Sequence, residues 1–322
     1  MRIVRPVIVC LLSIVLVAIA AAAWGAPTGF AVNSRGDSND PQMINALWRV
    51  DLETGESEYI GWTGYIDLEA LALDAEGVLF GADDDSKTLL RVSQVTGLAL
   101  PLGGIGNRFN MGVALDSSMD FGMTFDCEGQ GFVLSEIQQT LFRADLEDGR
   151  LTPVGEPGSL GVPLTDIAAY GRDIFGIGVG SDSPQSEAAP NLYRVDLETG
   201  TTELVGPLGD QVGVYNNAGL AFDEQGRLWA ITDRRATEAG DFPSEILLID
   251  TETGAAEKVA ETLVGIESLA IAPPAPCSAS VRGTPQPLPV PIGGWPVVLL
   301  LIAGVGALAL RRLRSGLGQA TS

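Results

Sequence analysis

The fold of this chain is indicated by one stretch of sequence, Leu47-Trp48-Arg49-Val50-Asp51-Leu52-Glu53-Thr54-Gly55. The stretch returns almost unchanged at residues 192–200, and in looser form at 90–97, 141–149 and 247–254. The glycines that end the five copies are 42, 52, 51 and 54 residues apart. A period of this length, built from short strands, is typical of the blades of a β-propeller.

Each repeat supplies four short strands. The first carries a small residue and then alternating apolar residues, as in 69–73. The turn at 74–77 joins it to a second strand at 78–82, because Asp bonds its own downstream backbone and Gly accepts a positive φ. The stretch quoted above holds the third strand, and a fourth follows its turn, as in 58–61. The third strand is apolar on both faces, which indicates a sheet packed between two neighbouring sheets.

The two ends of the repeat region complement each other. Residues 29–33 resemble a second strand with no first strand before it, and residues 266–271 resemble a first strand with nothing after it. Pairing these two segments makes one composite blade and removes the free sheet edges. We therefore predict an all-β, five-bladed propeller over residues 27–272. Residues 103–118 fit no strand of the repeat, so a sixth, degenerate blade is the competing count.

Both ends of the chain have the composition of targeting segments. Arg2 and Arg5 precede an uncharged apolar run that ends in small residues, which predicts a signal peptide at 1–23; an uncleaved anchor helix is the alternative. A Pro-rich linker is predicted at 273–289. An apolar helix at 295–310 follows, about 24 Å long and so marginal for a bilayer core of about 30 Å. Arginines after it should stay cytoplasmic with a tail at 315–322.

The C-terminal segment resembles a known class of sorting signal. Residues 290–314 carry Val290, Pro291 and Trp295, then the apolar helix, then Arg311, Arg312 and Arg314. This layout resembles the PEP-CTERM and IPTL-CTERM signals of exosortase systems in Gram-negative bacteria. The resemblance implies processing by a membrane protease, with the helix in the inner membrane beforehand, and delivery to the envelope or outside. The repeats themselves resemble those of NHL-type exported propellers, a pattern shared by binders, enzymes and scaffolds.

Charge and composition exclude several function classes. All 41 acidic residues lie within 27–280, and six of the 19 basic residues lie outside it, so this region carries a net charge of −28. Such a surface repels nucleic acid and anionic lipid, and it attracts metal cations or basic partners; high solubility is the simpler explanation. The chain has no histidine, which excludes Ser-His-Asp and Cys-His catalysis and histidine metal sites.

Two cysteines remain after removal of the signal peptide. Cys127 follows the first strand of an inner blade, and Cys277 lies in the predicted linker beyond the closing blade. We therefore expect that they do not form a disulfide that stabilises the blades.

Two groups of acidic residues are candidate ligand sites. Asp83, Asp84 and Asp85 follow a second strand and offer oxygen ligands for Ca²⁺, although a solvated acidic loop is the simpler explanation. The second group lies on or near the first strands, which line the channel of a propeller. It could ring a cation, bind a basic or sugar ligand, or only contact channel water. Its members are Glu69, Asp120, Asp166 and Glu267.

Four arginines recur at one position of the third strand: Arg49, Arg91, Arg143 and Arg194. They could form a ring of ligand contacts. We favour a structural role, in which each reaches between blades to a carboxylate or a carbonyl, because the repetition follows the structural unit.

These features predict an exported or cell-envelope propeller that acts as a non-catalytic binding module for an extracellular ligand or protein. Ca²⁺ is the one cofactor for which the sequence offers ligands. A carboxylate-dependent glycosidase is the first alternative, since paired acids hydrolyse glycosides without histidine. A structural component of the extracellular matrix is the second.

Overall fold

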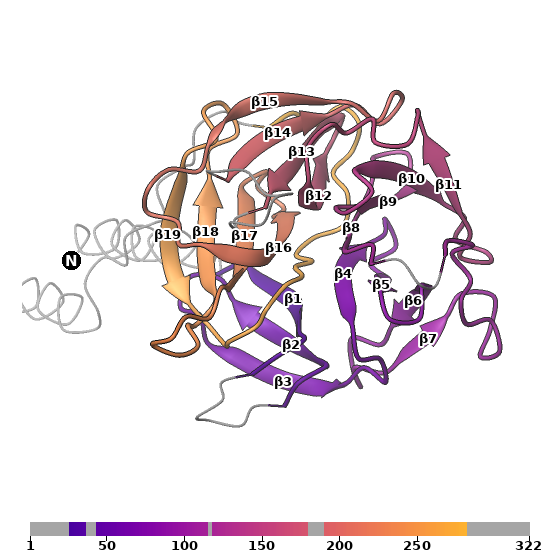
Figure 1. The fold of residues 1–322 in the computed structure, drawn as a ribbon, viewed down its shortest axis with the longest axis horizontal. Helices are drawn as coiled ribbons and strands as arrows, with labels where there is room; N and C mark the ends of the chain where they lie inside the picture. Colours follow the sequence, from indigo (N-terminus) through magenta and orange to yellow (C-terminus); the bar gives the residue numbers. More distant parts are fainter. Residues whose placement is uncertain (1–25, 37–42, 115–117, 180–189, 282–322) are drawn as a thin grey trace, which may run out of the picture. The chain divides into compact units, whose positions relative to one another are not determined.

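The computed structural model describes residues 26–36, 43–114, 118–179 and 190–281. These residues form five antiparallel sheets placed around a ring, as Figure 1 shows. Among them, no helix is both long and apolar enough to span a bilayer. The predicted signal peptide and the whole predicted sorting signal, with its helix, lie outside the described residues.

The sheets follow one another along the chain. Blade 1 contains β1 (Thr28–Asn33), β2 (Ala46–Asp51) and β3 (Ser57–Trp62). Blade 2 contains β4 (Leu68–Leu73), β5 (Leu79–Asp83), β6 (Thr88–Val92) and β7 (Ala99–Pro101). Blade 3 contains β8 (Phe121–Phe125), β9 (Gly131–Ser135), β10 (Thr140–Ala144) and β11 (Leu151–Val154). Blade 4 contains β12 (Leu164–Tyr170), β13 (Asp173–Gly178), β14 (Asn191–Val195) and β15 (Thr202–Pro207). Blade 5 contains β16 (Tyr215–Phe222), β17 (Leu228–Arg234), β18 (Glu245–Ile249) and β19 (Ala256–Glu261).

The predicted closure of the ring is confirmed. Phe30 and Ala270 exchange backbone hydrogen bonds of 2.7 and 2.9 Å, and a second bridge joins Asn33 to Ile266. Residues 266–270, which we call the closing segment, therefore supply the inner strand of blade 1. The count of five blades is also confirmed, because residues 103–114 form no strand. Instead, the side chain of Asn110 bonds the backbone N–H and C=O of Leu89, which fixes this stretch against β6.

The repeated turn after each third strand has a local cause. Asp51 Oδ1 accepts the backbone N–H groups of Glu53 and Thr54, at 3.0 and 2.8 Å. Asp196 and Asp250 close the equivalent turns in the same way. Gly55 has a φ of 76°, and a Cβ there would lie 1.8 Å from a backbone oxygen of β19. The motif therefore stabilises the turn of each blade, and it does not indicate a ligand-binding site.

Three of the four recurring arginines have a carboxylate or carbonyl partner, as expected: Arg49 pairs with Glu58 and Arg194 with Asp173 within a blade, and Arg143 bonds the Leu197 carbonyl of the next blade. All four arginines also share a further kind of partner, an aromatic ring. Each lies across from an aromatic residue of the second strand in the same blade and covers its ring. The distances from guanidinium carbon to ring centroid are 5.8 Å for Arg49 on Phe30, 5.4 Å for Arg91 on Phe80, 5.8 Å for Arg143 on Phe132 and 4.7 Å for Arg194 on Phe175. Each guanidinium group therefore lies over a ring of its own blade at the distance of a cation–π contact.

Candidate functional site

The inner strands lie side by side around the channel, and buried acids join them. Asp166 of β12 accepts the N–H groups of Met123 in β8 at 2.9 Å and Leu220 in β16 at 2.7 Å, as well as that of Ile167. Burial raises the pKa of Asp166 well above its ordinary value, and these N–H donors oppose the rise. Both of its oxygens are therefore engaged in tying blades 3, 4 and 5 together.

Six acidic side chains gather at the end of the channel where the inner strands begin. We call this group the acidic mouth; it consists of Asp67, Glu69, Asp84, Asp120, Glu136 and Glu267. Carboxylate oxygens of Asp67, Glu69 and Asp84 all lie within 4.8 Å of one another. Asp67 and Asp120 are half-buried, and the other four are buried.

Four of these acids occupy corresponding positions in two neighbouring blades. Asp67 precedes the inner strand of blade 2, and its carbonyl accepts the N–H of Asp84 at 2.8 Å. Asp120 precedes the inner strand of blade 3, and its carbonyl accepts the N–H of Glu136 at 2.9 Å. In each of these blades, the residue before the inner strand therefore lies beside the residue that follows the second strand.

The other blades carry different residues at the same two positions. In blade 1 the pair is Gly265 and Ser34, joined by an equivalent bond of 3.2 Å, and in blade 5 it is Val214 and Arg235, joined at 3.0 Å. The backbone contact is therefore a property of the repeat, whereas the acidic side chains are not. Building a blade does not require them.

Burial, and then repulsion between neighbouring carboxylates, raises the pKa of several of these acids. Burial, and then the charge of Asp84, raises the pKa of Asp67 to about 6. Burial, and then Asp120, raises the pKa of Glu136 to about 8. Glu69 is affected by burial first and then by Asp120 and Glu267, and its pKa lies well above the usual value. Lys87 pairs with Asp84 at 2.8 Å, so one ammonium group faces several carboxyl groups.

Glu267 has one oxygen without a partner. Its Oε2 accepts a hydrogen bond of 2.8 Å from the Ser34 hydroxyl. Its Oε1 is buried and accepts no hydrogen bond from the part of the chain that the structure describes. Burial raises the pKa of Glu267, the Ser34 bond lowers it, and the charges of Asp233, Asp67 and Asp120 raise it. Asp67 and Asp120 are therefore close enough for their charges to act on this carboxyl group.

The structure separates the three consecutive aspartates of the predicted calcium loop. Asp83 is structural, because its carboxylate accepts hydrogen bonds from the Asp67 N–H at 3.1 Å and from both the N–H and the hydroxyl of Ser86. Asp84 belongs to the acidic mouth, and Asp85 is exposed. Of the four predicted channel residues, Glu69, Asp120 and Glu267 come together, and Asp166 serves as the inter-blade tie.

Sequence reasoning missed Asp67 and Glu136. Both lie just outside the strand cores that we compared between repeats, one before a first strand and one after a second strand. A comparison of the residues that flank each strand would have found an acid at these positions in two adjacent repeats and not in the others.

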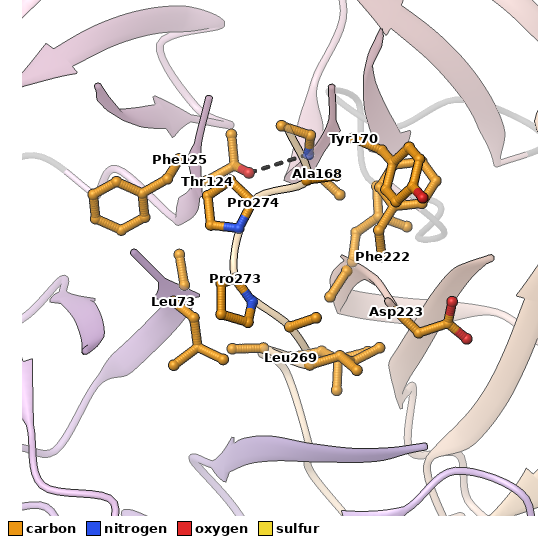
Figure 2. Close-up of a pocket in the computed structure, with 18 of the residues that line it drawn as sticks. Leu73, Thr124, Phe125, Ala168, Tyr170, Phe222, Asp223, Leu269, Pro273 and Pro274 are labelled. Carbon is orange, nitrogen blue, oxygen red and sulfur yellow. Dashed lines mark hydrogen bonds between the residues drawn. The ribbon is translucent and has the colours of Figure 1, made fainter. Parts of the chain in front are cut away.

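The opposite end of the channel is apolar and covered. Residues 273–281, which we call the strap, continue from the closing segment, and Pro273, Pro274 and Pro276 line a cavity of about 330 Å³. Figure 2 shows Pro273 and Pro274 between Leu73 on one side and Phe222 on the other. The ends of all five inner strands contribute to this cavity.

The strap is held by a disulfide, and our expectation for the cysteines is wrong. Cys127 and Cys277 are bonded, with Cα atoms 5.0 Å apart. The chain runs from the closing segment across the end of the channel, and so it passes the turn after β8 that carries Cys127. A separation of 150 residues along the chain therefore becomes a contact in space.

A polar groove of about 770 Å³ lies between blades 3 and 4. Charged side chains line it, and they pair with one another: Arg172 with Glu128 at 3.3 Å and Arg194 with Asp173 at 2.9 Å. Asp196 in the same groove closes a turn, and its backbone donors lower its pKa. The groove thus offers no pair of unengaged carboxylates among the residues named.

Comparisons with known proteins give likenesses of fold. No family model and no curated protein matches the chain. Among solved structures, virginiamycin B lyase from Staphylococcus aureus is 11% identical with a TM-score of 0.36, over 66% of this chain and 62% of that one. A chain of the nidogen/laminin complex is 15% identical with a TM-score of 0.44, over 76% and 82%. TolB from Acinetobacter baumannii is 14% identical with a TM-score of 0.40, over 71% and 51%. The chain thus spans about three fifths of the lyase and half of TolB.

Proposed function

We propose that this protein is an exported propeller that binds a cationic ligand at the acidic mouth and catalyses no reaction. The observation that carries this proposal is that the acids of blades 2 and 3 stand where blades 1 and 5 have Gly, Ser, Val and Arg. Residues that build a blade recur with the blade. In blades 2 and 3, acidic residues replace the uncharged or basic residues of blades 1 and 5 at one end of the channel. A positively charged ligand explains this difference.

The disulfide supports export. Disulfides persist outside the cytoplasm, where thiols are not kept reduced. A bond between Cys127 and Cys277 therefore agrees with the signal peptide proposed at 1–23 and with the sorting signal proposed at 290–314. In this proposal a membrane protease processes the chain near Pro291, and the propeller is delivered to the envelope or the medium.

Several carboxylates near the two cavities are engaged in ion pairs or hydrogen bonds, which favours a binding role over glycoside hydrolysis. Hydrolysis needs two carboxyl groups free to act on the substrate, about 5–10 Å apart. At the strap cavity, Asp223 bonds Arg227 at 2.6 Å and the Trp229 indole at 2.9 Å. In the groove between blades 3 and 4, Glu128 and Asp173 are ion-paired.

The experiment is expression of the full chain in a bacterium that has an exosortase system, followed by cell fractionation, intact mass and thiol labelling. We expect a form without residues 1–23, found outside the cytoplasm, with Cys127 and Cys277 resistant to alkylation until reduced. Replacing Arg311, Arg312 and Arg314 by Ser should leave the C-terminal signal unprocessed, while Arg282→Ser, the matched control, should be processed normally.

Two results would contradict the proposal. One is a full-length chain in the cytoplasm with both thiols free. The other is hydrolysis of any member of a glycoside panel by the purified protein, with activity lost in a carboxylate variant of the acidic mouth.

A further inference from the structure

The strap and the inner strands border a space that the described side chains leave unfilled. The strap begins with three prolines and one alanine, and the cavity of about 330 Å³ between them and the strand ends is the strap cavity. Protein interiors are packed as densely as organic crystals, with few voids larger than one water molecule. This cavity has the volume of about eleven waters at about 30 Å³ each. It is therefore too large for a packing defect, and it falls within the range of ligand pockets, about 300–1,000 Å³.

The wall that the strap provides is held in place at three blades. The strap continues directly from the closing segment, which pairs with β1 in blade 1, and Cys277 ties it to Cys127 of blade 3. It then passes Gly171 of blade 4, where a Cβ would lie 2.1 Å from the Ala279 carbonyl oxygen. A wall that is already ordered does not have to be ordered by a ligand, so binding costs less conformational entropy.

The residues that line the strap cavity favour an uncharged, mostly apolar ligand. Leucine side chains and the rings of Phe125, Tyr170 and Phe222 form much of the wall, as Figure 2 shows. Among the described residues that line the cavity, none is positively charged, so an anion would have no partner there. Asp223, the buried acid of the wall, is already paired with Arg227 at 2.6 Å, so a cation would meet no free buried acid. The lining thus disfavours ligands of either charge.

Thr124 supplies one polar contact in this wall. Its side chain is 7% exposed, and its hydroxyl oxygen accepts the Ala169 N–H at 3.2 Å, the bond drawn in Figure 2. Both residues line the cavity, so the hydroxyl group lies at the cavity surface. A threonine hydroxyl can also donate a proton, and no described residue accepts it here. Because a buried donor without an acceptor is unfavourable, an acceptor on a ligand would be stabilised at this position.

We propose that the strap cavity binds a small, uncharged ring compound that carries a carbonyl group, of the class of bicyclic ketones and lactones. The rings of the ligand pack against Phe125 and Phe222, and its carbonyl oxygen accepts the hydrogen bond of the Thr124 hydroxyl. The volume fits a molecule of about ten to fifteen non-hydrogen atoms. The strap cavity lies at the opposite end of the channel from the acidic mouth, and this site is independent of the proposed binding of a cationic ligand.

The test is a ligand-observed NMR titration of the purified protein, with its disulfide intact. The probes are tetralone, a bicyclic ketone, and tetralin, the same ring system without the oxygen. We expect tetralone to bind at one site with a dissociation constant below about 1 mM. Thr124→Val keeps the shape of the side chain and removes the hydroxyl, so it should weaken tetralone about three- to tenfold and leave tetralin unchanged. Thr165→Val is the matched control, because Thr165 is a buried threonine of an inner strand outside the cavity wall, and it should change neither constant.

A second variant decides the case in which Thr124→Val does not fold. Ala275→Leu adds volume to the strap wall of the cavity and should weaken both probes at least about fivefold. Ser278→Leu makes a similar addition at an exposed strap residue outside the cavity wall and should weaken neither. Naphthoate, a negatively charged bicyclic compound, should not bind at about 1 mM.

Any of four results would overturn this proposal: no saturable binding of tetralone, binding of naphthoate as tight as that of tetralone, equal effects of Thr124→Val on tetralone and tetralin, or no effect of Ala275→Leu on either. None of these results bears on the acidic mouth, whose cationic ligand is tested by other measurements.

Discussion

Without a bound cation, the acidic mouth should make stability depend on pH between 6 and 8. The chain has no histidine, and ordinary carboxylates are already ionised at pH 6, so few other groups titrate in this range. Burial, followed by the charge of Asp120, raises the pKa of Glu136 from 4.5 to about 8. The perturbation is therefore a change of pH across this window in the EDTA-treated protein, and Glu136→Gln removes the group responsible.

The sign and size follow from the difference between folded and unfolded pKa. In the folded protein Glu136 keeps a proton that the unfolded chain has released, so stability falls as the pH rises from about 4.5 to about 8. The full shift corresponds to roughly 5 kcal/mol, and roughly 2 kcal/mol of it falls between pH 6 and 8. Asp67, with a pKa of about 6 and a half-buried side chain, adds less. A loss of this size lowers the melting temperature of a domain of this length by about 4–8 °C.

The assay is thermal and urea unfolding at several pH values in EDTA. The parent should lose stability steadily from pH 6 to 8. Glu136→Gln should lose less over the same range, because its amide does not titrate while other acids with a raised pKa, such as Asp67 and Glu69, still do. Glu147→Gln, an exposed acid of the same blade, is the control and should follow the parent. Equal slopes for Glu136→Gln and the parent, or a parent with no slope, would refute the reasoning.

Three further variants test the structural roles. Cys277→Ser should lower the free energy of unfolding by up to about 5 kcal/mol in urea, because it opens a loop of 150 residues, with the far-UV spectrum retained; unchanged stability would contradict the disulfide. Asp166→Asn should lower it by at least about 2 kcal/mol, since one amide oxygen cannot accept all three N–H groups; a smaller loss would mean that the tie between blades is weak. Arg143→Met should change it by less than about 1 kcal/mol, because the exposed guanidinium covers the Phe132 ring and makes one long hydrogen bond of 3.5 Å to the Leu197 carbonyl, and loss of ligand binding in this variant would restore a functional role to the arginines.

The fold could be predicted because its signals are local and repeated. The Asp-Leu-Glu-Thr-Gly turn fixes its own geometry through bonds such as those of Asp51, and apolar residues on both faces of β2 require neighbouring sheets. The closing pair was visible as two incomplete units, residues 29–33 and 266–271. Each of these inferences follows from comparing one repeat with another. None of them required knowing which side chains outside the repeated strands lie close together in space.

The disulfide and the acidic mouth, in contrast, depend on contacts between residues that lie outside the repeated strand cores. Whether Cys277 reaches Cys127 is decided by the path of the strap across the channel, and no periodicity encodes that path. Asp67 joins Glu69 and Asp84 because it directly precedes β4, and Asp84 directly follows β5, the hairpin partner of β4. The three consecutive aspartates 83–85 predicted one site in the sequence. In the structure they lie in three different environments, because side chains alternate between the two faces of a strand and the turn that follows changes the direction of the chain.

The acidic mouth lowers the stability of the fold that carries it, and this bears on its purpose. Burial, and then repulsion between neighbouring carboxylates, raises the pKa of several of its acids, so near pH 8 the domain is less stable than near pH 6 by at least the roughly 2 kcal/mol that Glu136 alone contributes. Blades 1 and 5 show that the same backbone contact forms with uncharged or basic residues. Features that destabilise a fold without being needed to build it are expected at functional sites. A cation present at 100 times its dissociation constant stabilises the folded state by about 2.7 kcal/mol, which is comparable to what the crowding removes. The proposed ligand therefore accounts for both the position of these acids and the destabilisation that accompanies them.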